Sequence, residues 1–381
     1  MVVAPAIIAH EPEIPGHPNW QLEEVSVSDP GDHEVLVEMI AVGICHTDIV
    51  LSSVSQGSHG IDYPKIAGHE GAGYVRQVGE KVKSVKLGDP VLLSFYSCGS
   101  CAECDGGHPA YCDSFAKENY VGRKGLASRR RSSEGIWTRF FGQSSFSQYS
   151  VVDESCLVNA TDLLQDANEL KLFAPLGCGF QTGMGAIENI TNAGPDDVVI
   201  IAGMGSVGMA SLMTAAIRGC RGIIAVDRLS DRLELARGLG ATHIIDTSQS
   251  EISITDAVQH VFPNGASIFI DTTGLPGIIE SGLKALKQRG KLVLIGVPPS
   301  GYRLSFDATE HINKGRSVMG CIEGDSVPKA AIPRMIQWYR EGRFPFDKLI
   351  TFFEARSFDK ALSQLHQGSA VKAVLVWNTT N

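Results

Sequence analysis

The chain has 381 residues, of which 43% are hydrophobic and 20% charged, a composition typical of a folded globular protein long enough for two domains. Its formal net charge of −9 argues against nucleic acid or an anionic membrane as a partner, since both attract basic surfaces. The one basic cluster is followed by serines and a glutamate, so we interpret it as a solvated loop: Lys124, Arg129, Arg130 and Arg131.

The nine cysteines and the first residues indicate the compartment. An odd number of cysteines without a secretory signal argues against a disulfide framework and for thiols kept reduced or bound to metal. The opening MVVAPAIIA lacks a basic region and runs directly into charged residues, so we do not interpret it as a signal peptide. No uninterrupted apolar run approaches the roughly 20 residues that span a bilayer. We therefore expect a cytoplasmic protein.

The first 165 residues predict short strands, and helical periodicity is scarce there. Residues 34–40, 73–78 and 90–93 alternate or run apolar between turn signals, which favours a mostly β domain built as a barrel or sandwich. Two motifs lie on turns beside these strands, Gly43-Ile44-Cys45-His46-Thr47-Asp48 and Gly68-His69-Glu70-Gly71-Ala72-Gly73.

Cys45 and His69 on these turns have the chemistry of zinc ligands. Zn²⁺ binds thiolate sulfur at about 2.3 Å and imidazole nitrogen at about 2.0 Å, and catalytic sites leave a fourth position open. Each residue alone is more typical of a small core cysteine or a hydrogen-bonded histidine. Cys178, in the stretch Gly177-Cys178-Gly179-Phe180-Gln181-Thr182-Gly183, offers a third soft ligand, and the combination favours a metal site.

Four cysteines in a Gly-rich segment predict a second, closed metal site. Their spacings of two, two and seven residues suit a tetrahedral Zn²⁺ site with no position left for substrate. The alternative is a zinc ribbon that binds nucleic acid, but the acidic balance and the lack of a second cysteine pair at ribbon spacing argue against it. The predicted ligands are Cys98, Cys101, Cys104 and Cys112.

From about residue 183, predicted strands alternate with helices. The apolar run 197–202 predicts a central parallel strand, and residues 209–218 predict a helix. Between them, Gly203-Met204-Gly205-Ser206-Val207-Gly208 forms a turn whose glycines let a pyrophosphate approach the helix N-terminus.

The next predicted strand, 222–227, ends in Asp227, 19 residues after Gly208. A carboxylate there accepts hydrogen bonds from a ribose hydroxyl and repels a 2′-phosphate, so we expect NAD rather than NADP as cofactor. Arg228 and Arg232 weaken that preference.

The remaining pattern completes a Rossmann domain and then returns to the first domain. Strands are predicted at 243–246, 266–271, 291–297 and 317–321, which brings the parallel sheet to six strands. Helices at 328–340 and 357–367 and a strand at 373–377 follow. We predict a NAD-binding Rossmann domain, residues 183–321, inserted into a discontinuous domain, residues 1–182 and 322–381, that carries the cysteine lobe at 98–112.

Together these motifs resemble the zinc-containing alcohol dehydrogenases of the medium-chain dehydrogenase/reductase family. The motifs described above, with Phe146-Ser147-Gln148-Tyr149, occur in the family's order and spacing over nearly the whole chain. The resemblance implies an α/β fold with a GroES-like β-barrel catalytic domain and a Rossmann parallel sheet. It also implies two zinc ions per chain, a catalytic zinc on Cys45, His69 and Cys178 and a structural zinc on the four clustered cysteines.

The resemblance further implies roles for residues around the catalytic zinc. Thr47 matches the hydroxyl that hydrogen-bonds the substrate oxygen, Asp48 the acid that orients the histidine ligand, and Glu70 a carboxylate that assists ligand exchange. Val50 stands where liver-type enzymes end their proton relay in a histidine. We hypothesise that His46, at a position often filled by a pyrophosphate-binding arginine, receives the proton instead, by way of Thr47 and the cofactor ribose.

Other residues match cofactor and substrate positions of the family. Lys372 matches a phosphate-binding arginine, and Thr182 matches a residue beside the nicotinamide. The end of the predicted strand 291–297 is expected to line the cofactor through Ile295, Gly296 and Val297. Three aromatic residues align with positions that line the substrate channel, although ordinary hydrophobic packing is the alternative: Phe95, Phe140 and Phe141.

The expected function is the zinc- and NAD-dependent interconversion of a primary aryl or allylic alcohol and its aldehyde, as in the aryl-alcohol (benzyl-alcohol) dehydrogenase branch. Aromatic walls suit flat alcohols through ring contacts. One alternative is the same family with another substrate, such as S-hydroxymethylglutathione, a polyol or a specialised-metabolite intermediate; another is a non-catalytic structural relative. By resemblance we expect a homodimer or homotetramer that pairs through an edge strand near residues 302–306.

Overall fold

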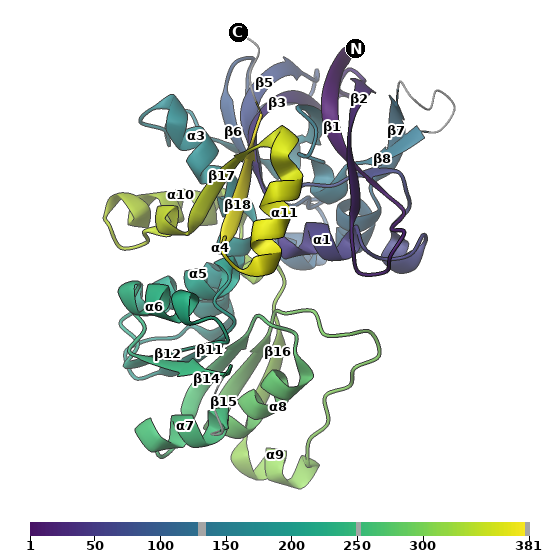
Figure 1. Cartoon of the computed structure of the whole chain (residues 1–381). Coiled ribbons are helices and arrows are strands. Elements are labelled where there is room, and N and C mark those ends of the chain that lie inside the picture. Colours follow the sequence, from purple (N-terminus) through teal and green to yellow (C-terminus); the bar gives the residue numbers. More distant parts are fainter. Residues whose placement is uncertain (129–134, 249–252, 378–381) are drawn as a thin grey trace. The chain divides into compact units, whose positions relative to one another are not determined.

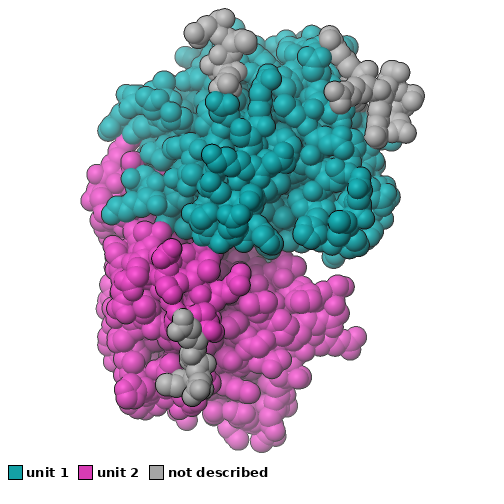
Figure 2. All heavy atoms as spheres, in the orientation of Figure 1, with its two compact units in different colours: residues 1–178, 327–336, 347–381 teal, residues 179–326, 337–346 magenta. Residues whose placement is uncertain are grey.

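The computed structural model describes residues 1–128, 135–248 and 253–377. The chain divides into two compact units, coloured separately in Figure 2. Three of the four residues of the predicted basic loop, Arg129, Arg130 and Arg131, lie outside the described residues. Unit 1 comprises Met1–Cys178, Val327–Ile336 and Asp347–Asn381, and unit 2 comprises Gly179–Ser326 and Gln337–Phe346.

The short segment 337–346 groups with unit 2 because its aromatic side chains pack there. The ring centroids of Phe344 and Phe346 lie 6.4 and 5.4 Å from that of Phe180. Helix α10 (Pro328–Arg340), which the sequence predicts with these bounds, therefore begins in unit 1 and ends in unit 2.

Unit 1 contains a small closed barrel. Strand β1 pairs antiparallel with β2 from Val2 opposite Val27 to His10 opposite Asn19, and the short β4 closes the ring between β1 and β8. In order around the barrel the strands are β1 (Val2–His10), β2 (Asn19–Val27), β7 (Arg123–Ser128), β8 (Gly135–Thr138) and β4 (Lys65–Ile66).

Unit 1 also contains a seven-stranded sheet, of which β3, β5, β6, β17 and β18 are labelled in Figure 1. It is centred on β3, which pairs with β5, β9 and β18. The three predicted early strands are confirmed as β3, β5 and β6, and the closing strand as β18. Because β18 pairs with β3, the last segment of the chain completes a sheet begun by its first. The strands are β10 (Leu157–Asn159), β6 (Pro90–Leu93), β5 (Gly71–Val78), β3 (Glu34–Gly43), β18 (Lys372–Val376), β17 (Ile350–Glu354) and β9 (Tyr149–Asp153).

Helices of unit 1 are short before residue 165, as the scarce helical periodicity predicts. The predicted helix at 357–367 is present as α11. The helices include α1 (His46–Leu51), α2 (Ala102–Asp105), the π-helix η3 (Lys117–Val121), α3 (Ala167–Phe173) and α11 (Phe358–Gln367), with a 3-10 turn, η6 (Ala174–Gly177), before Cys178.

Unit 2 is built on a six-stranded parallel sheet, which confirms the predicted Rossmann fold. Its strands run β13-β12-β11-β14-β15-β16, so the order reverses beside β11. The strands match the predicted positions except that the fifth starts earlier and ends earlier. They are β11 (Val198–Ala202), β12 (Gly222–Asp227), β13 (His243–Asp246), β14 (Ala266–Asp271), β15 (Leu286–Leu294) and β16 (Ser317–Gly320).

Alternate side chains of this sheet bury two apolar layers. Val198, Ile200 and Ile224 pack with Val258 of α7 and Leu283 of α8 in one buried cluster, whereas α5 and α6 contact strands β11, β12 and β13. The helices of unit 2 are α4 (Gly179–Gly185), the π-helix η7 (Ala186–Thr191), α5 (Ser206–Ile217), α6 (Ser230–Gly238), α7 (Ile254–Val261), α8 (Pro276–Ala285) and α9 (Ala308–Lys314).

The last two expectations concern the edge strand proposed for subunit pairing and a membrane-spanning segment. The predicted edge strand near residues 302–306 does not form within this single chain: these residues lie in the loop between β15 and α9, and β16 forms that edge of the sheet. Among the described residues, no helix is both long and apolar enough to cross a membrane.

Candidate metal and cofactor sites

The first candidate metal site gathers Cys45, His69, Glu70 and Cys178 in unit 1. Cys45 lies between β3 and α1, the next two lie between β4 and β5, and Cys178 follows η6. One ligand atom from each lies within 4.8 Å of the others. The two sulfur atoms are 3.9 Å apart, close to the about 3.8 Å expected for two thiolates on one tetrahedral zinc with Zn–S bonds of about 2.3 Å.

His69 is oriented for metal binding by Asp48, as the sequence predicts. Nδ1 of His69 lies 2.9 Å from Oδ1 of Asp48, and both side chains are buried. The same carboxylate accepts hydrogen bonds from the backbone N–H groups of Cys45 and Gly68, at 2.9 and 3.0 Å. Nε2 of His69 is buried without a hydrogen-bond partner. A buried polar atom in this state is costly, and a metal ion would satisfy it.

The charges around this site favour metal-binding protonation states at the sulfur. The hydrogen bond with Cys178 holds the pKa of Cys45 well below its ordinary value, burial opposes this, and the charge of His69 lowers it further. Burial by itself would lower the pKa of His69, but the Asp48 carboxylate and the Cys45 thiolate raise it well above the usual range. A thiolate is the form in which cysteine ligates metal, so the electrostatics at Cys45 suit zinc.

Glu70 and Lys372 form a buried ion pair behind these ligands. Nζ of Lys372 donates to both carboxylate oxygens of Glu70 at 2.8 Å and to the carbonyl oxygen of Ile44 at 3.2 Å. Lys372 is 1% exposed. The ammonium of Lys372 bonds these groups inside unit 1, and its match to a phosphate-binding position stays a prediction.

The predicted pocket residues Phe140 and Phe141 pack directly on His69. The Phe141 ring is stacked on the imidazole with centroids 4.3 Å apart, and the Phe140 ring meets it edge-on at 5.6 Å. Phe95 belongs to the same aromatic group through Phe115, at 5.8 Å. All three predicted residues are buried.

Gln143 is a structural residue of this site that sequence reasoning missed. Its Nε2 donates to the carbonyl oxygens of His69 and Ser94, both at 2.9 Å, and its Oε1 accepts from Gly71 N–H at 3.2 Å. It is fully buried. The only available signal was an amide residue between Phe141 and Phe146, and polar neighbours such as Ser144 make that signal weak.

Thr47, His46 and Val50 lie on α1, immediately after Cys45. Oγ1 of Thr47 lies 3.7 Å from Sγ of Cys45, which places a hydroxyl beside the ligand group. His46 is exposed at the first position of the helix, and Val50 is 36% exposed. His46 is therefore a polar, titratable residue exposed on α1, whereas the exposed Val50 on the same helix has no titratable group.

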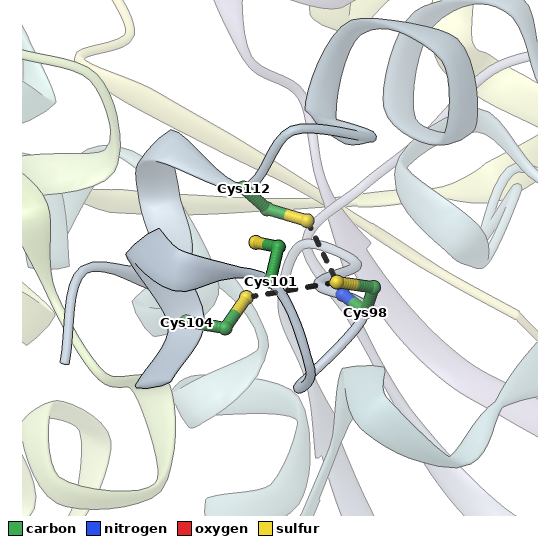
Figure 3. Close-up of side chains that lie close together, drawn as sticks. All are labelled: Cys98, Cys101, Cys104 and Cys112. Atoms are coloured by element: carbon green, nitrogen blue, oxygen red, sulfur yellow. Dashed lines mark hydrogen bonds between the residues drawn. The ribbon is translucent and has the colours of Figure 1, made fainter. Parts of the chain in front are cut away.

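The second candidate metal site is formed by the four predicted cysteines around α2. Figure 3 shows Cys98, Cys101, Cys104 and Cys112 pointing toward one another, and their sulfur atoms all lie within 4.8 Å. The Cys98 and Cys104 sulfurs are 4.0 Å apart, again near the spacing expected on a tetrahedral zinc. Hydrogen bonds from Ser100 lower the pKa of Cys98 to about 6. Four sulfur ligands fit a closed zinc site, and all nine cysteines of the chain are free thiols.

The Gly-rich turn between β11 and α5 has the form of a phosphate cradle. Gly203 adopts φ +91°, and Gly208 packs so closely that a Cβ would lie 1.8 Å from the Gly203 carbonyl oxygen. A Cβ on Gly205 would meet no atom within 4 Å. Gly205 precedes α5, whose N-terminus has no side-chain cap. The turn thus leaves open space and free N–H groups where a pyrophosphate would bind.

Asp227 ends β12 beside this turn. Its Oδ2 accepts from Met204 N–H at 2.6 Å, and its Oδ1 accepts from the N–H groups of Arg228 and Leu229. These bonds fix the carboxylate at the carboxyl edge of the sheet, next to the glycine turn. Arg228 is exposed, and Arg232 lies on α6, two residues beyond its start.

The remaining predicted cofactor residues of unit 2 lie in two places. Ile295, Gly296 and Val297 follow β15, where a Cβ on Gly296 would lie 2.1 Å from Gly274 N, so the loops after β14 and β15 are in tight contact. Thr182 is buried in α4. His46 and Lys372 belong to unit 1.

Comparison with known proteins agrees with the fold described above. Residues 31–162 match the alcohol dehydrogenase GroES-like domain, and residues 206–341 match the zinc-binding dehydrogenases. The chain is 35% identical to a geraniol dehydrogenase of Castellaniella defragrans, over 93% of this chain and 94% of that protein. It is 36% identical to a probable alcohol dehydrogenase of a Pseudomonas species, over 74% and 88%.

Two solved structures each match 99% of this chain over 100% of their own length. One is an alcohol dehydrogenase zinc-binding domain protein from Burkholderia ambifaria, with 35% identity and a TM-score of 0.91. The other is a benzyl alcohol dehydrogenase from Acinetobacter calcoaceticus, with 31% identity and a TM-score of 0.89. The chain belongs to the zinc-dependent alcohol dehydrogenases of the medium-chain dehydrogenase/reductase family. It is accordingly an oxidoreductase that acts on alcohols.

Proposed function

We propose that this chain uses two zinc ions and NAD(H) to interconvert a primary aryl or allylic alcohol and its aldehyde. The observation that carries the proposal is the environment of His69. Its Nε2 is buried and unpartnered, its other nitrogen is fixed by Asp48, and its ring lies against Phe140 and Phe141. The imidazole of His69 is therefore both a candidate metal ligand and a neighbour of the Phe140 and Phe141 rings, which we call the aromatic wall.

Cys45, His69 and Cys178 would hold the catalytic zinc, and the four clustered cysteines the structural zinc. The chemistry supplied by the catalytic zinc is Lewis acidity, which lowers the pKa of a hydroxyl much as it lowers that of water from 15.7 to about 7. Asp48 holds His69 in one tautomer and orientation, and Gln143 holds the backbone on either side of that residue.

Thr47 and His46 would move the proton released by the alcohol. The Thr47 hydroxyl, beside Cys45, accepts a hydrogen bond from the substrate hydroxyl and starts the exit of the proton. His46, exposed at the start of α1, then takes up the proton and exchanges it with water. Val50 cannot serve this purpose because its side chain neither accepts nor donates a proton.

Residues of unit 2 would bind the dinucleotide, which supplies the hydride acceptor. The open space at Gly205 and the N-terminus of α5 suit the pyrophosphate. The fixed carboxylate of Asp227 favours NAD over NADP, because it attracts a ribose hydroxyl and repels a 2′-phosphate.

The substrate class is supported by the aromatic residues and by the relatives. Phe140 and Phe141 are buried with their rings against His69, and Phe95 is buried in the same aromatic group through Phe115. Geraniol is an allylic primary alcohol and benzyl alcohol an aryl one, and relatives named for both are similar over nearly the whole chain. Both alcohols carry a hydroxymethyl group next to a planar π system, which suits ring contacts.

A cytoplasmic location and a homodimer or homotetramer complete the proposal. Nine free thiols suit a reducing compartment. Val297, Phe306 and Ile312 of unit 2 are 82%, 48% and 78% exposed, and such apolar side chains suit burial between subunits. Light scattering of the purified protein measures the oligomeric state.

A substrate panel combined with metal analysis tests the proposed function. We expect two zinc ions per chain and NADH formation with benzyl alcohol and geraniol, with NADP a much poorer cofactor. Turnover confined to S-hydroxymethylglutathione or a polyol would show that the proposed aryl or allylic substrate class is wrong. A single zinc and no turnover over a broad alcohol panel would support a non-catalytic relative.

A further inference from the structure

Lys65 is a buried lysine that contacts the aromatic residues of the first metal site. It lies on the short strand β4 and is 3% exposed. Nζ donates to the carbonyl oxygens of Tyr120 at 2.5 Å and Val121 at 2.9 Å, the last two residues of the π-helix η3. The same Nζ lies 5.9 Å from the centroid of the Phe140 ring.

An ammonium group at this depth is costly. Burial lowers the pKa of Lys65 to about 8, against the attraction of Asp62, so the side chain is still mainly charged at neutral pH. A methionine would fill a similar volume without the cost of desolvating a charge. The contacts that Lys65 makes, rather than its contribution to packing, therefore call for an explanation.

Those contacts connect Lys65 to both rings that touch His69. Phe140 lies under the ammonium and meets His69 edge-on. Tyr120, whose carbonyl accepts from Lys65, packs its ring against Phe141 at 5.7 Å, and Phe141 is stacked on His69. Lys65 thus holds the main chain of η3, which supports Phe141 through Tyr120, and its ammonium also lies over the ring of Phe140.

Phe141 depends on outside support because its backbone is in the left-handed region. Its φ is +52°, which is strained for an aromatic residue. Neighbouring contacts must hold such a residue in place, and η3 supplies them through Tyr120. Asn119 anchors the same helix by accepting from Tyr96 N–H and donating to the Phe115 carbonyl.

We propose that Lys65 is a positioning residue that fixes the aromatic wall beside His69 and thereby sets the preference for flat alcohols over small aliphatic ones. This inference rests on the proposed function. A flat substrate needs the Phe140 and Phe141 rings in a defined orientation, whereas a three-carbon alcohol makes little use of them. Loss of Lys65 should therefore weaken binding of the flat substrate selectively.

The test compares Lys65→Met and Lys65→Arg in the full zinc-loaded protein, with benzyl alcohol, geraniol and 1-propanol as substrates. Lys171→Met is the matched control, because Lys171 lies 5.7 Å from the Phe352 ring, a similar contact elsewhere in unit 1. We expect Lys65→Met to raise KM for the flat alcohols about tenfold, within the range of a desolvated cation–π contact, and to change kcat/KM for 1-propanol less than about twofold. Lys65→Arg should restore most of the preference, and Lys171→Met should behave as wild type.

The outcomes separate this inference from the proposed function. Turnover of flat alcohols by the wild type, with equal losses for all three alcohols or no loss in Lys65→Met, overturns the role of Lys65 alone. No turnover of either flat alcohol by the wild type overturns both. If Lys65→Met does not fold, Lys65→Gln, which is neutral and polar, takes its place with the same expected selectivity.

Discussion

The two cysteine-containing sites of unit 1 have similar ligand spacing but different surroundings. In both, the ligand atoms lie within 4.8 Å of one another, and sulfur pairs are 3.9 and 4.0 Å apart. The four-cysteine site is drawn from one segment, and three of its cysteines are partly exposed. The site of Cys45, His69 and Cys178 is assembled from three distant segments and is covered by aromatic rings. A metal with four sulfur ligands has a structural task, whereas three ligands with an adjacent wall leave room for chemistry.

The largest expected effect separates the two sites by metal content. Cys178→Ala should abolish turnover and lower the zinc content from two ions per chain to one, because it removes a sulfur ligand from the first site only. Zinc analysis and NADH formation measure both results. Cys220→Ala, which alters a buried thiol of unit 2, is the control and should keep both zinc ions and turnover. An active Cys178→Ala protein would overturn the assignment of the first site.

The converse variant addresses the four-cysteine site. Cys104→Ala should also lower the zinc content to one ion, but its main effect should be on stability, because a structural zinc contributes folding free energy. We expect the apparent Tm to fall by roughly 5 °C or more, while protein that remains folded keeps most of its turnover. Differential scanning calorimetry and initial rates measure the two effects. Complete loss of activity in folded Cys104→Ala would mean that the two sites do not have separate tasks.

The different assembly of the two sites also explains how far the sequence could predict them. The four cysteines lie within fifteen residues, so spacing alone indicates a tetrahedral site. Cys45, His69 and Cys178 lie far apart, so their donor chemistry only favoured a shared metal site, and the resemblance to a family was needed to imply a catalytic zinc on them. The fold was predictable because its signals are local: strands 34–40, 73–78 and 90–93 and the glycine turn after β11 are all confirmed.

Contacts between distant residues account for what the sequence did not predict. Gln143 supports His69 from 74 residues away, and Lys65 reaches Val121 from 56 residues away. Lys372, which matches a phosphate-binding position, pairs with Glu70, 302 residues away, a partner that the sequence did not predict. A matching position specifies where a backbone lies, whereas the partner of a long flexible side chain depends on which charge the fold buries beside it.

A smaller effect is expected from the residue that orients His69. Asp48→Asn keeps an oxygen for Nδ1–H of His69 but removes the carboxylate charge. Partners of this kind are worth roughly 10- to 100-fold in metal affinity or activity, so we expect a loss in that range with the four-cysteine site still loaded. Zinc titration against a chelator and steady-state kinetics measure it. Wild-type zinc affinity and rate in Asp48→Asn would show that hydrogen-bond geometry alone, without the charge, orients His69.

The smallest effect is expected at the exposed end of the first site. His46→Gln retains a polar side chain of similar size but cannot take up a proton, so kcat should fall modestly and depend less on pH. Val50→His should partly restore that dependence, because it places an imidazole on the same helix one turn further along. A pH–rate profile from pH 5 to 9 for the three proteins measures the effect, and an unchanged profile in His46→Gln would exclude His46 as the proton acceptor. His46 and Val50 lie beside the first site only, so zinc binding at the four-cysteine site should be the same in all three proteins. The two sites would then differ in proton transfer as well as in metal content.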